Sequence, residues 1–463
     1  MGDFLYRNKL LGKGNSRVIK YTSSLTTSDV AIVKEVITVL MAHTRNLARH
    51  NLIPGEVADK VIEELKKLHD YPEPLFAMEA EDVHEAIEMY LKNRLGSDAG
   101  WIALGKSRND HVAAALRLKS RKELIKLLWE LLSLREVLLE MASRYERVLM
   151  PAFTHLQPAQ VTTFAHYLLS FDEELSHYMR ILRFIINEVL SESPLGAGAG
   201  TTTNVPVSRY ELARELGFSR LVINSIRATG SRDFIMVISS ILTCISLVLS
   251  RLAEDFIIFS TPQFNYISVG AEFQDTSSLM PHKRNLIVME IARAWGAESL
   301  GHLMSILAII KGLPTGYNLD LQEINKHFIY LGEKTIETIA IVRDMLKSIK
   351  VNEEHVKADI TKHHLLTTDY TELLALKLRK PYREVYELIA SLIRHHKGVH
   401  EVYKKLSSQL GRTLHPEEVI NKPHEGSPNP YYVRKYINEA LKEIEDFRRY
   451  LGSLNKHNVA NIT

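Results

Sequence analysis

The chain has 463 residues, of which 45% are apolar and 24% are charged, and its net charge is +3. This length allows roughly two to four domains with a large buried core. The near-balance of charge, with no dense basic tract among aromatics, gives no reason to expect nucleic acid as a partner. The single cysteine, Cys244, excludes a disulfide within the chain. We expect a reducing, cytoplasmic setting in which Cys244 is buried and inert.

Three helical regions are predicted in chain order: an N-terminal domain at 1–105, a central domain at 106–350 and a C-terminal domain at 351–463. In the first, residues 81–95 (EDVHEAIEMYLKNRL) have a strongly helical pattern. In the third, a stretch rich in proline and glycine lies at 423–430. The sequence therefore predicts an all-α protein of three helical domains.

The central region is marked by long intervals without glycine or proline, at 106–150, 159–193 and 231–261. Strands need turn residues far more often than this. Leucines at 127, 131, 134 and 138, followed by Met141, repeat at the spacing of one helix face. A helix over 106–150 would be about 67 Å long at roughly 1.5 Å per residue. We therefore predict an elongated bundle that associates through its helical faces.

Residues 234–250 are the most apolar stretch, but we do not expect a membrane span. The stretch is slightly too short, it contains five serine or threonine residues, and charges at 233, 251, 254 and 255 flank it closely. The N-terminal residues also lack the apolar core of a signal peptide. The better interpretation is a helix buried in the middle of the bundle.

Four polar segments interrupt the helices, at 104–110, 151–160, 270–285 and 313–323. Each adjoins the start or end of a long helix, where free backbone N–H groups suit anionic ligands. Each segment alone could equally be a solvated loop. In the third, Ser277 and Ser278 precede Pro281, a pattern typical of a helix start. Lys283, Arg284 and Asn285 would then lie in the first turn, where cations oppose the helix dipole unless they face a bound anion.

These segments resemble those of a known family. The run TSSLMPHKRN at 276–285 resembles the serine-loop signature GSSxMPxKxNP of the fumarase/aspartase superfamily, and THLQPAQ at 154–160 resembles its histidine segment. LGKSRND at 104–110 and YNLDLQE at 317–323 resemble segments of the argininosuccinate lyases within it. Residues 20–29, 81–91, 231–234, 251–260 and 367–389 also resemble that family, in its order, so the resemblance covers nearly the whole chain.

The resemblance implies a homotetramer in which the central bundles form a twenty-helix core. Each active site would take segments from three subunits. The implied reaction is β-elimination of argininosuccinate to arginine and fumarate, in arginine biosynthesis, with no cofactor and no metal. A base takes a proton from the carbon beside a carboxylate, donors stabilise the carbanion, and the leaving guanidino nitrogen is protonated.

By the same resemblance Ser277 removes the proton as an alkoxide, and His155 belongs to the acid that protonates the leaving nitrogen. Glu290 would orient His155 and raise its basicity, and Lys283 would stabilise the carbanion. The sequence leaves open whether Ser277 and His155 exchange roles. Expected substrate contacts, carried over position by position, are Ser24, His84, Arg108, Asn109, Thr154, Asn285, Tyr317 and Gln322.

Several positions depart from the family pattern. Thr276 replaces the glycine of the serine loop, Leu286 replaces its proline, and Leu319 stands where a basic residue is common. Asn325 stands where the family has a substrate-binding lysine, although Lys326 is adjacent. These changes affect the expected contacts to the arginine end and the carboxylates of the substrate more than they affect the elimination chemistry.

Parts of the sequence also match other functions. The run HKRN at 282–285 resembles adenylosuccinate lyase, and an idle structural protein on the same scaffold is a third possibility. Residues 100–107 fit a P-loop pattern, but that motif needs a strand before it, whereas a helical pattern precedes it here. GAGAG at 196–200 has the wrong spacing for a dinucleotide site. His396 and His400 have metal-ligand spacing without an evident third ligand.

Overall fold

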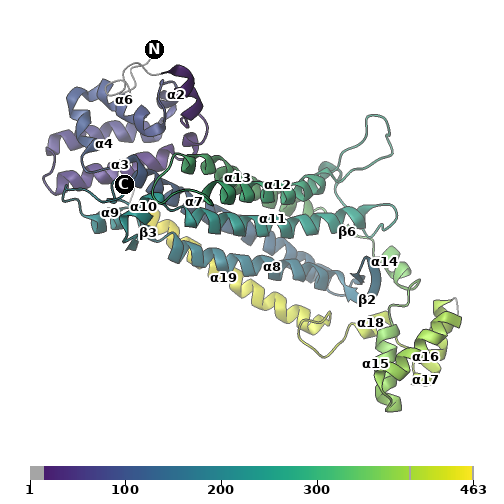
Figure 1. Ribbon diagram of the computed structural model, residues 1–463. Helices are drawn as coiled ribbons and strands as arrows, with labels where there is room; N and C mark the ends of the chain where they lie inside the picture. Colours follow the sequence, from purple (N-terminus) through teal and green to yellow (C-terminus); the bar gives the residue numbers. More distant parts are fainter. Residues whose placement is uncertain (1–14, 396–397, 461–463) are drawn as a thin grey trace.

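A computed structural model describes residues 15–395 and 398–460. They form an elongated, mostly helical molecule (Figure 1). The predicted all-α class is confirmed, and three small two-stranded sheets accompany the helices. The predicted pair of His396 and His400 cannot be followed, since His396 lies outside the described residues.

The N-terminal helices gather at one end of the molecule (Figure 1). The helical pattern at 81–95 corresponds to α6, whose N-cap Asp82 accepts a hydrogen bond from the backbone N–H of Glu85. Arg45 of α3 binds Glu215 of the central region at 3.2 Å, and His50, the C-cap residue after α3, binds Glu211 at 2.9 Å. The elements of this end are α2 (Ser16–Thr22), η1 (Asp29–Ala31), α3 (Val33–Arg49), α4 (Gly55–Asp70), α5 (Glu73–Phe76), α6 (Val83–Leu95) and η2 (Gly96–Ala103).

Five long helices run back and forth to make the central bundle (Figure 1): α7 (Arg108–Arg144), α8 (Phe164–Phe184), α11 (Asp233–Ser260), α12 (Ile287–Ile310) and α13 (Asp320–Leu346). The predicted apolar face of α7 is confirmed, because Leu127, Leu131, Leu134 and Leu138 are fully buried. Shorter elements connect the helices: η3 (Ile185–Val189), α9 (Arg209–Glu215), α10 (Ser225–Gly230), η4 (Ala271–Phe273), β3 (Glu192–Ser193), β4 (Arg220–Leu221), β5 (Ile267–Ser268) and β6 (Lys350–Val351).

The first long helix is shorter than the glycine and proline gap predicted. A capping box at Ser107 and Asp110 starts α7, and the helix ends at Arg144. The chain then enters β1 (Leu149–Thr154), which pairs antiparallel with β2 (Gln157–Thr163). The chain therefore leaves the helix six residues before the predicted end at residue 150, and the hairpin begins at Leu149.

The apolar stretch at 234–250 forms most of α11, a helix long and apolar enough to cross a membrane by length and composition alone. It packs instead against α8, α12 and α13, and 56% of its most apolar window is buried within the fold. Its approach to α12 requires Gly296, because a Cβ there would lie 2.6 Å from the Ser250 Cβ. The expected buried helix is thus what the structure shows.

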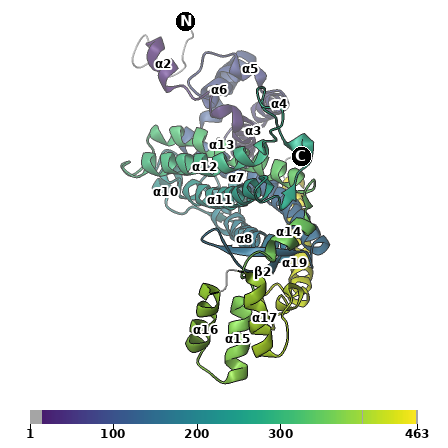
Figure 2. The ribbon, with the colours of Figure 1, turned by 90° about the vertical axis from the view of Figure 1, so that its right-hand side faces the viewer.

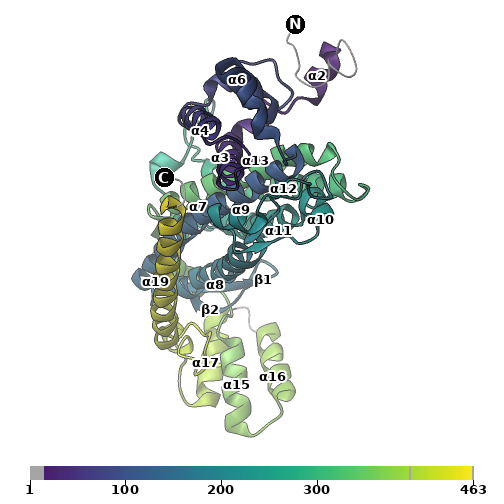
Figure 3. The same cartoon turned by 90° about the vertical axis from the view of Figure 1, so that its left-hand side faces the viewer.

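The C-terminal residues contribute both to the bundle and to its far end. The last helix, α19 (Pro430–Ala460), extends beside the bundle, and α15–α17 lie at the end opposite to the N-terminal helices (Figures 2 and 3). Buried Arg135 of α7 forms a paired hydrogen bond with Asp172 of α8 and contacts Glu443 of α19 at 3.0 Å. The remaining elements are α14 (Glu353–Ile360), α15 (Thr367–Leu378), α16 (Tyr382–His395), α17 (Val399–Leu410) and α18 (Pro416–Val419).

Candidate active site

The expected site residues fall into two groups at opposite ends of the bundle. One group lies beside the N-terminal helices and consists of Ser24, His84, Arg108, Asn109, Tyr317 and Gln322. The other lies on the hairpin, in the loop before α12 and in the first turn of α12, and consists of Thr154, His155, Ser277, Lys283, Asn285 and Glu290. The 24 residues of α12 alone separate the ends by about 36 Å. One chain therefore does not bring the two groups together.

In the first group, buried carboxylates hold the expected contacts in place. The Ser24 hydroxyl donates to Asp29 Oδ2 at 2.8 Å, and Asp29 Oδ2 also accepts the backbone N–H of Val83 at 3.0 Å. Arg108 pairs with Asp82 Oδ2 at 2.7 Å. Burial raises the pKa of Asp29, against the opposing effect of these hydrogen bonds. Sequence reasoning missed Asp29 and Asp82, although each lies within a segment that resembles the family.

His84 lies in this group as a neutral, buried side chain. It is 7% exposed, and its Nε2 has no hydrogen-bond partner among the described residues. Burial, with smaller contributions from Lys106 and Arg108, lowers the pKa of His84 to about 4 against the opposing effect of Asp82. Asn109, in the first turn of α7, is partly buried. An uncharged imidazole can offer a hydrogen bond to a ligand without adding charge.

Tyr317 reaches the first group from the loop between α12 and α13, and the partly buried Gln322 follows in the first turn of α13. The pKa of the Tyr317 phenol is raised by burial. Arg232 opposes this rise of the Tyr317 pKa, while Asp82 and Asp29 add to it.

Asn325 stands at the position where the family has a substrate-binding lysine, and the structure shows its surroundings. Asn325 is 2% exposed and faces the interior, and its Oδ1 has no partner among the described residues. Lys326 is exposed and pairs with Glu323 at 2.6 Å along the same helix. Within one chain the Lys326 side chain therefore points to solvent and does not occupy the interior position of Asn325.

In the second group, the hairpin presents its turn to solvent. His155 and Leu156 both adopt left-handed backbone conformations, with φ of +55° and +57°, which makes the two-residue reversal between β1 and β2. Thr154 and His155 are exposed in the single chain. A ladder of backbone hydrogen bonds behind them gives the turn a fixed base. Side chains on such a turn are well placed to contact a neighbouring molecule.

The serine segment is a closed loop and not the start of a helix. The backbones of Asp275 and Asn285 exchange two hydrogen bonds, of 3.0 and 2.8 Å, across its neck. The predicted helix start near Pro281 is wrong, because α12 begins at Ile287 after the N-cap residue Leu286, which makes no side-chain cap. The neck pairing holds 283–285 out of the helix, so Lys283 does not lie in its first turn.

Ser277 occupies a local turn within this loop. Its Oγ accepts backbone N–H groups from Leu279 at 3.2 Å and from Met280 at 3.0 Å. Two donors aimed at one hydroxyl oxygen favour negative charge on it. Lys283 and Glu290 are exposed in the single chain, and Asn285 is partly buried.

The competing motifs have structural roles. Residues 100–107 begin within η2, which follows α6, and no strand precedes them in the described chain, so the P-loop interpretation fails. In the GAGAG turn, the backbone N–H groups of Gly196 and Gly198 both bind Asp110 Oδ2 at 3.0 Å. That turn therefore fixes the start of α7, next to Arg108 and Asn109.

Comparisons with known proteins identify the family of the chain. Residues 13–301 match the protein family described as lyase. Argininosuccinate lyase of Pyrococcus furiosus is 45% identical over 99% of this chain and 100% of its own length. The enzyme of that name from Sulfolobus acidocaldarius is 40% identical over 97% of this chain and 96% of its own length.

Solved structures of more distant proteins share the fold. An EDDS lyase in complex with formate aligns with a TM-score of 0.83 and 23% identity, over 95% of this chain and 91% of its own. A class II fumarase from Schistosoma mansoni aligns with a TM-score of 0.75 and 17% identity, over 86% and 92% of the two chains.

Proposed function

The chain belongs to the lyase family and, within the fumarase/aspartase superfamily, to the argininosuccinate lyases, and we propose that it cleaves argininosuccinate into arginine and fumarate by β-elimination. The observation that carries this proposal is the near-complete alignment with a lyase of that name at 45% identity. The same reaction places the chain in arginine biosynthesis, and we propose the cytoplasm as its location.

In the proposed reaction Ser277 takes the proton from the carbon beside a substrate carboxylate. The two N–H groups at its Oγ support this role, because they stabilise an alkoxide in place. Lys283 and Asn285, at the end of the same loop, would stabilise the carbanion that forms. His155, oriented by Glu290, would protonate the leaving nitrogen. The opposite assignment, with His155 as the base and Ser277 in the acid, uses the same side chains. The pH dependence of activity in Ser277 and His155 variants distinguishes the two assignments.

The site requires more than one subunit, and we propose the homotetramer that the resemblance implies. Several apolar side chains of α11 and α12 are exposed in the single chain, which favours association through these two helices. They are Val237, Leu247, Ile287, Ile291, Leu300 and Met304. When long helices of two copies pack antiparallel, the hairpin and serine loop of one copy come beside the Arg108 and Tyr317 end of another.

The test is to supply purified protein with argininosuccinate and, separately, with adenylosuccinate, and to follow fumarate. We expect fumarate from argininosuccinate only. Fumarate from adenylosuccinate only would replace the proposed substrate, as the HKRN run at 282–285 suggests. No fumarate from either would favour an idle structural protein.

A further inference from the structure

Arg232 is a buried cation to which the reaction above assigns no role. It lies between α10 and α11 and is 2% exposed. Its Nη1 donates to the backbone oxygens of Thr229 at 3.1 Å and Ser231 at 2.9 Å. Its Nε is buried without an acceptor among the described residues. Buried arginines are normally paired with a carboxylate, since an unpaired charge is costly to bury.

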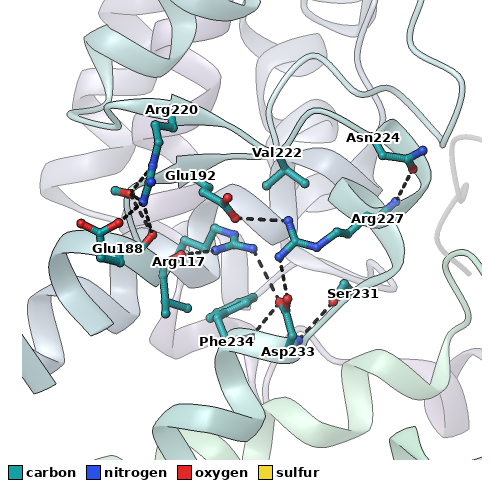
Figure 4. Close-up of polar contacts among 12 residues, drawn as sticks. Arg117, Glu188, Glu192, Arg220, Val222, Asn224, Arg227, Ser231, Asp233 and Phe234 are labelled. Atoms are coloured by element: carbon teal, nitrogen blue, oxygen red, sulfur yellow. Dashed lines mark hydrogen bonds and ion pairs between the residues drawn. The ribbon is translucent and has the colours of Figure 1, made fainter. Parts of the chain in front are cut away.

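The neighbouring carboxylates are committed to other arginines. Figure 4 shows Asp233 facing Arg117 and Arg227, at 3.9 and 2.7 Å, while Arg227 also pairs with Glu192 at 3.2 Å. Within the described chain, no carboxylate forms an ion pair with Arg232. Among the described residues, Arg232 therefore has backbone carbonyls as its hydrogen-bond partners, and Asp233 acts on it only from a distance.

The charge of Arg232 lies against the loop carrying Tyr317. The turn before Arg232 touches this loop directly, because a Cβ on Gly230 would be 2.6 Å from the Gly316 carbonyl carbon. Of the two cations that lower the pKa of the Tyr317 phenol, Arg232 has the larger effect and Arg108 the smaller. Arg108 is neutralised by Asp82 at 2.7 Å, whereas Arg232 has no such partner.

We propose that Arg232 is a positioning residue: its buried charge, held in the turn that packs against the Tyr317 loop, strengthens the hydrogen bond that Tyr317 donates to a carboxylate of the substrate. A phenol polarised by a cation is a stronger donor, and bonds between charged and neutral partners are stronger than neutral ones. Arg232 itself stays buried and does not touch the substrate. The inference rests on the proposed function, because argininosuccinate supplies the carboxylate.

A purely structural role of Arg232 predicts different effects of its substitutions. The two carbonyls bound by Nη1 close the end of α10, and any side chain that lost them would loosen this turn. Such a role predicts equal losses for Arg232→Lys and Arg232→Gln. The proposed role predicts that Lys, which keeps the charge, preserves binding better than Gln does.

The first experiment needs no catalysis. Difluorotyrosine, which is more acidic than tyrosine, is placed at position 317 of the full-length protein and titrated by fluorine NMR. We expect Arg232→Gln to raise the pKa of this phenol and Arg232→Lys to leave it near the parent value. The control is Arg121→Gln, since Arg121 is another buried arginine that donates to backbone carbonyls. An unchanged pKa in Arg232→Gln would overturn the inference. If that variant does not fold, Arg232→Met replaces it.

The second experiment is kinetic. With argininosuccinate, Arg232→Gln should raise KM about tenfold with little change in kcat, because Tyr317 becomes a weaker hydrogen-bond donor to the substrate carboxylate. In a Tyr317→Phe background the same change should have no further effect on KM. Additive losses in the double variant would contradict a role through Tyr317. If the parent protein made no fumarate, the proposed function would fail, while the fluorine titration would still decide the role of Arg232.

Discussion

Gly230 and Gly316 are in such close contact that a Cβ on Gly230 would stand 2.6 Å from the Gly316 carbonyl carbon. This contact fixes the loop of Tyr317 against the turn that carries Arg232. Two glycines from distant parts of the chain therefore set the position of one expected substrate contact.

Replacement of Gly230 by alanine should push the Tyr317 loop away. Overpacking of this kind destabilises by about 1–3 kcal/mol, and we expect a lower midpoint of urea unfolding together with a raised KM. The control is Gly312→Ala, because a Cβ at Gly312 meets nothing within 4 Å. Equal effects of the two substitutions would show that the Gly230 contact is unimportant.

Ser277→Ala should leave the fold intact and lower kcat by about 10²- to 10⁴-fold, the range for loss of a positioned base. Ser278→Ala, a change in the exposed neighbour, should retain most of the activity. A Ser277→Ala variant within about tenfold of the parent kcat, roughly 1.4 kcal/mol, would reject Ser277 as the proton acceptor.

The long helices could be predicted from sequence because glycine and proline are missing over such distances and leucines repeat on one face of α7. The ends of these elements could not. Residues 149–154 leave the helix because they pair with 157–163, and Ser277 caps a turn within its own loop. Asp29, Asp82 and Arg232 were missed because their importance lies in burial and in partners far along the chain.

Stability should fall on acidification because of buried histidines. Burial lowers the pKa of His43 and of His84 to about 4, below the ordinary value of 6.5. Between these pH values the unfolded chain binds more protons than the folded one, so the free energy of unfolding decreases as pH falls from about 6.5 to about 4. Asp110 acts in the opposite direction, since burial raises its pKa to about 6.

The variant His43→Gln tests this account, because an amide can still donate to the Leu104 oxygen that His43 Nε2 contacts at 2.9 Å. We expect a shallower decrease of the unfolding free energy with falling pH, measured by urea denaturation. His177→Gln, at an exposed position, should keep the parent slope. An unaltered slope in His43→Gln would mean that this imidazole does not contribute to the acid sensitivity.

Mixed tetramers should recover activity that neither parent has. Arg108→Gln and Ser277→Ala alter opposite ends of the bundle, so a tetramer containing both can still assemble some intact sites. Co-expressed variants should therefore regain part of the fumarate-forming activity. Co-expression of Ser277→Ala with Lys283→Met, two changes in one loop, should not. If co-expression of Arg108→Gln with Ser277→Ala also gave no recovery of activity, the sites would be built within a single chain.

The most direct measurement is a crystal structure of the Ser277→Ala variant with argininosuccinate bound. The account predicts that Tyr317 and Arg108 of one copy contact the ligand together with His155 and residue 277 from other copies. A ligand held by one copy only, or residue 277 and His155 far apart in every pairing of subunits, would contradict it.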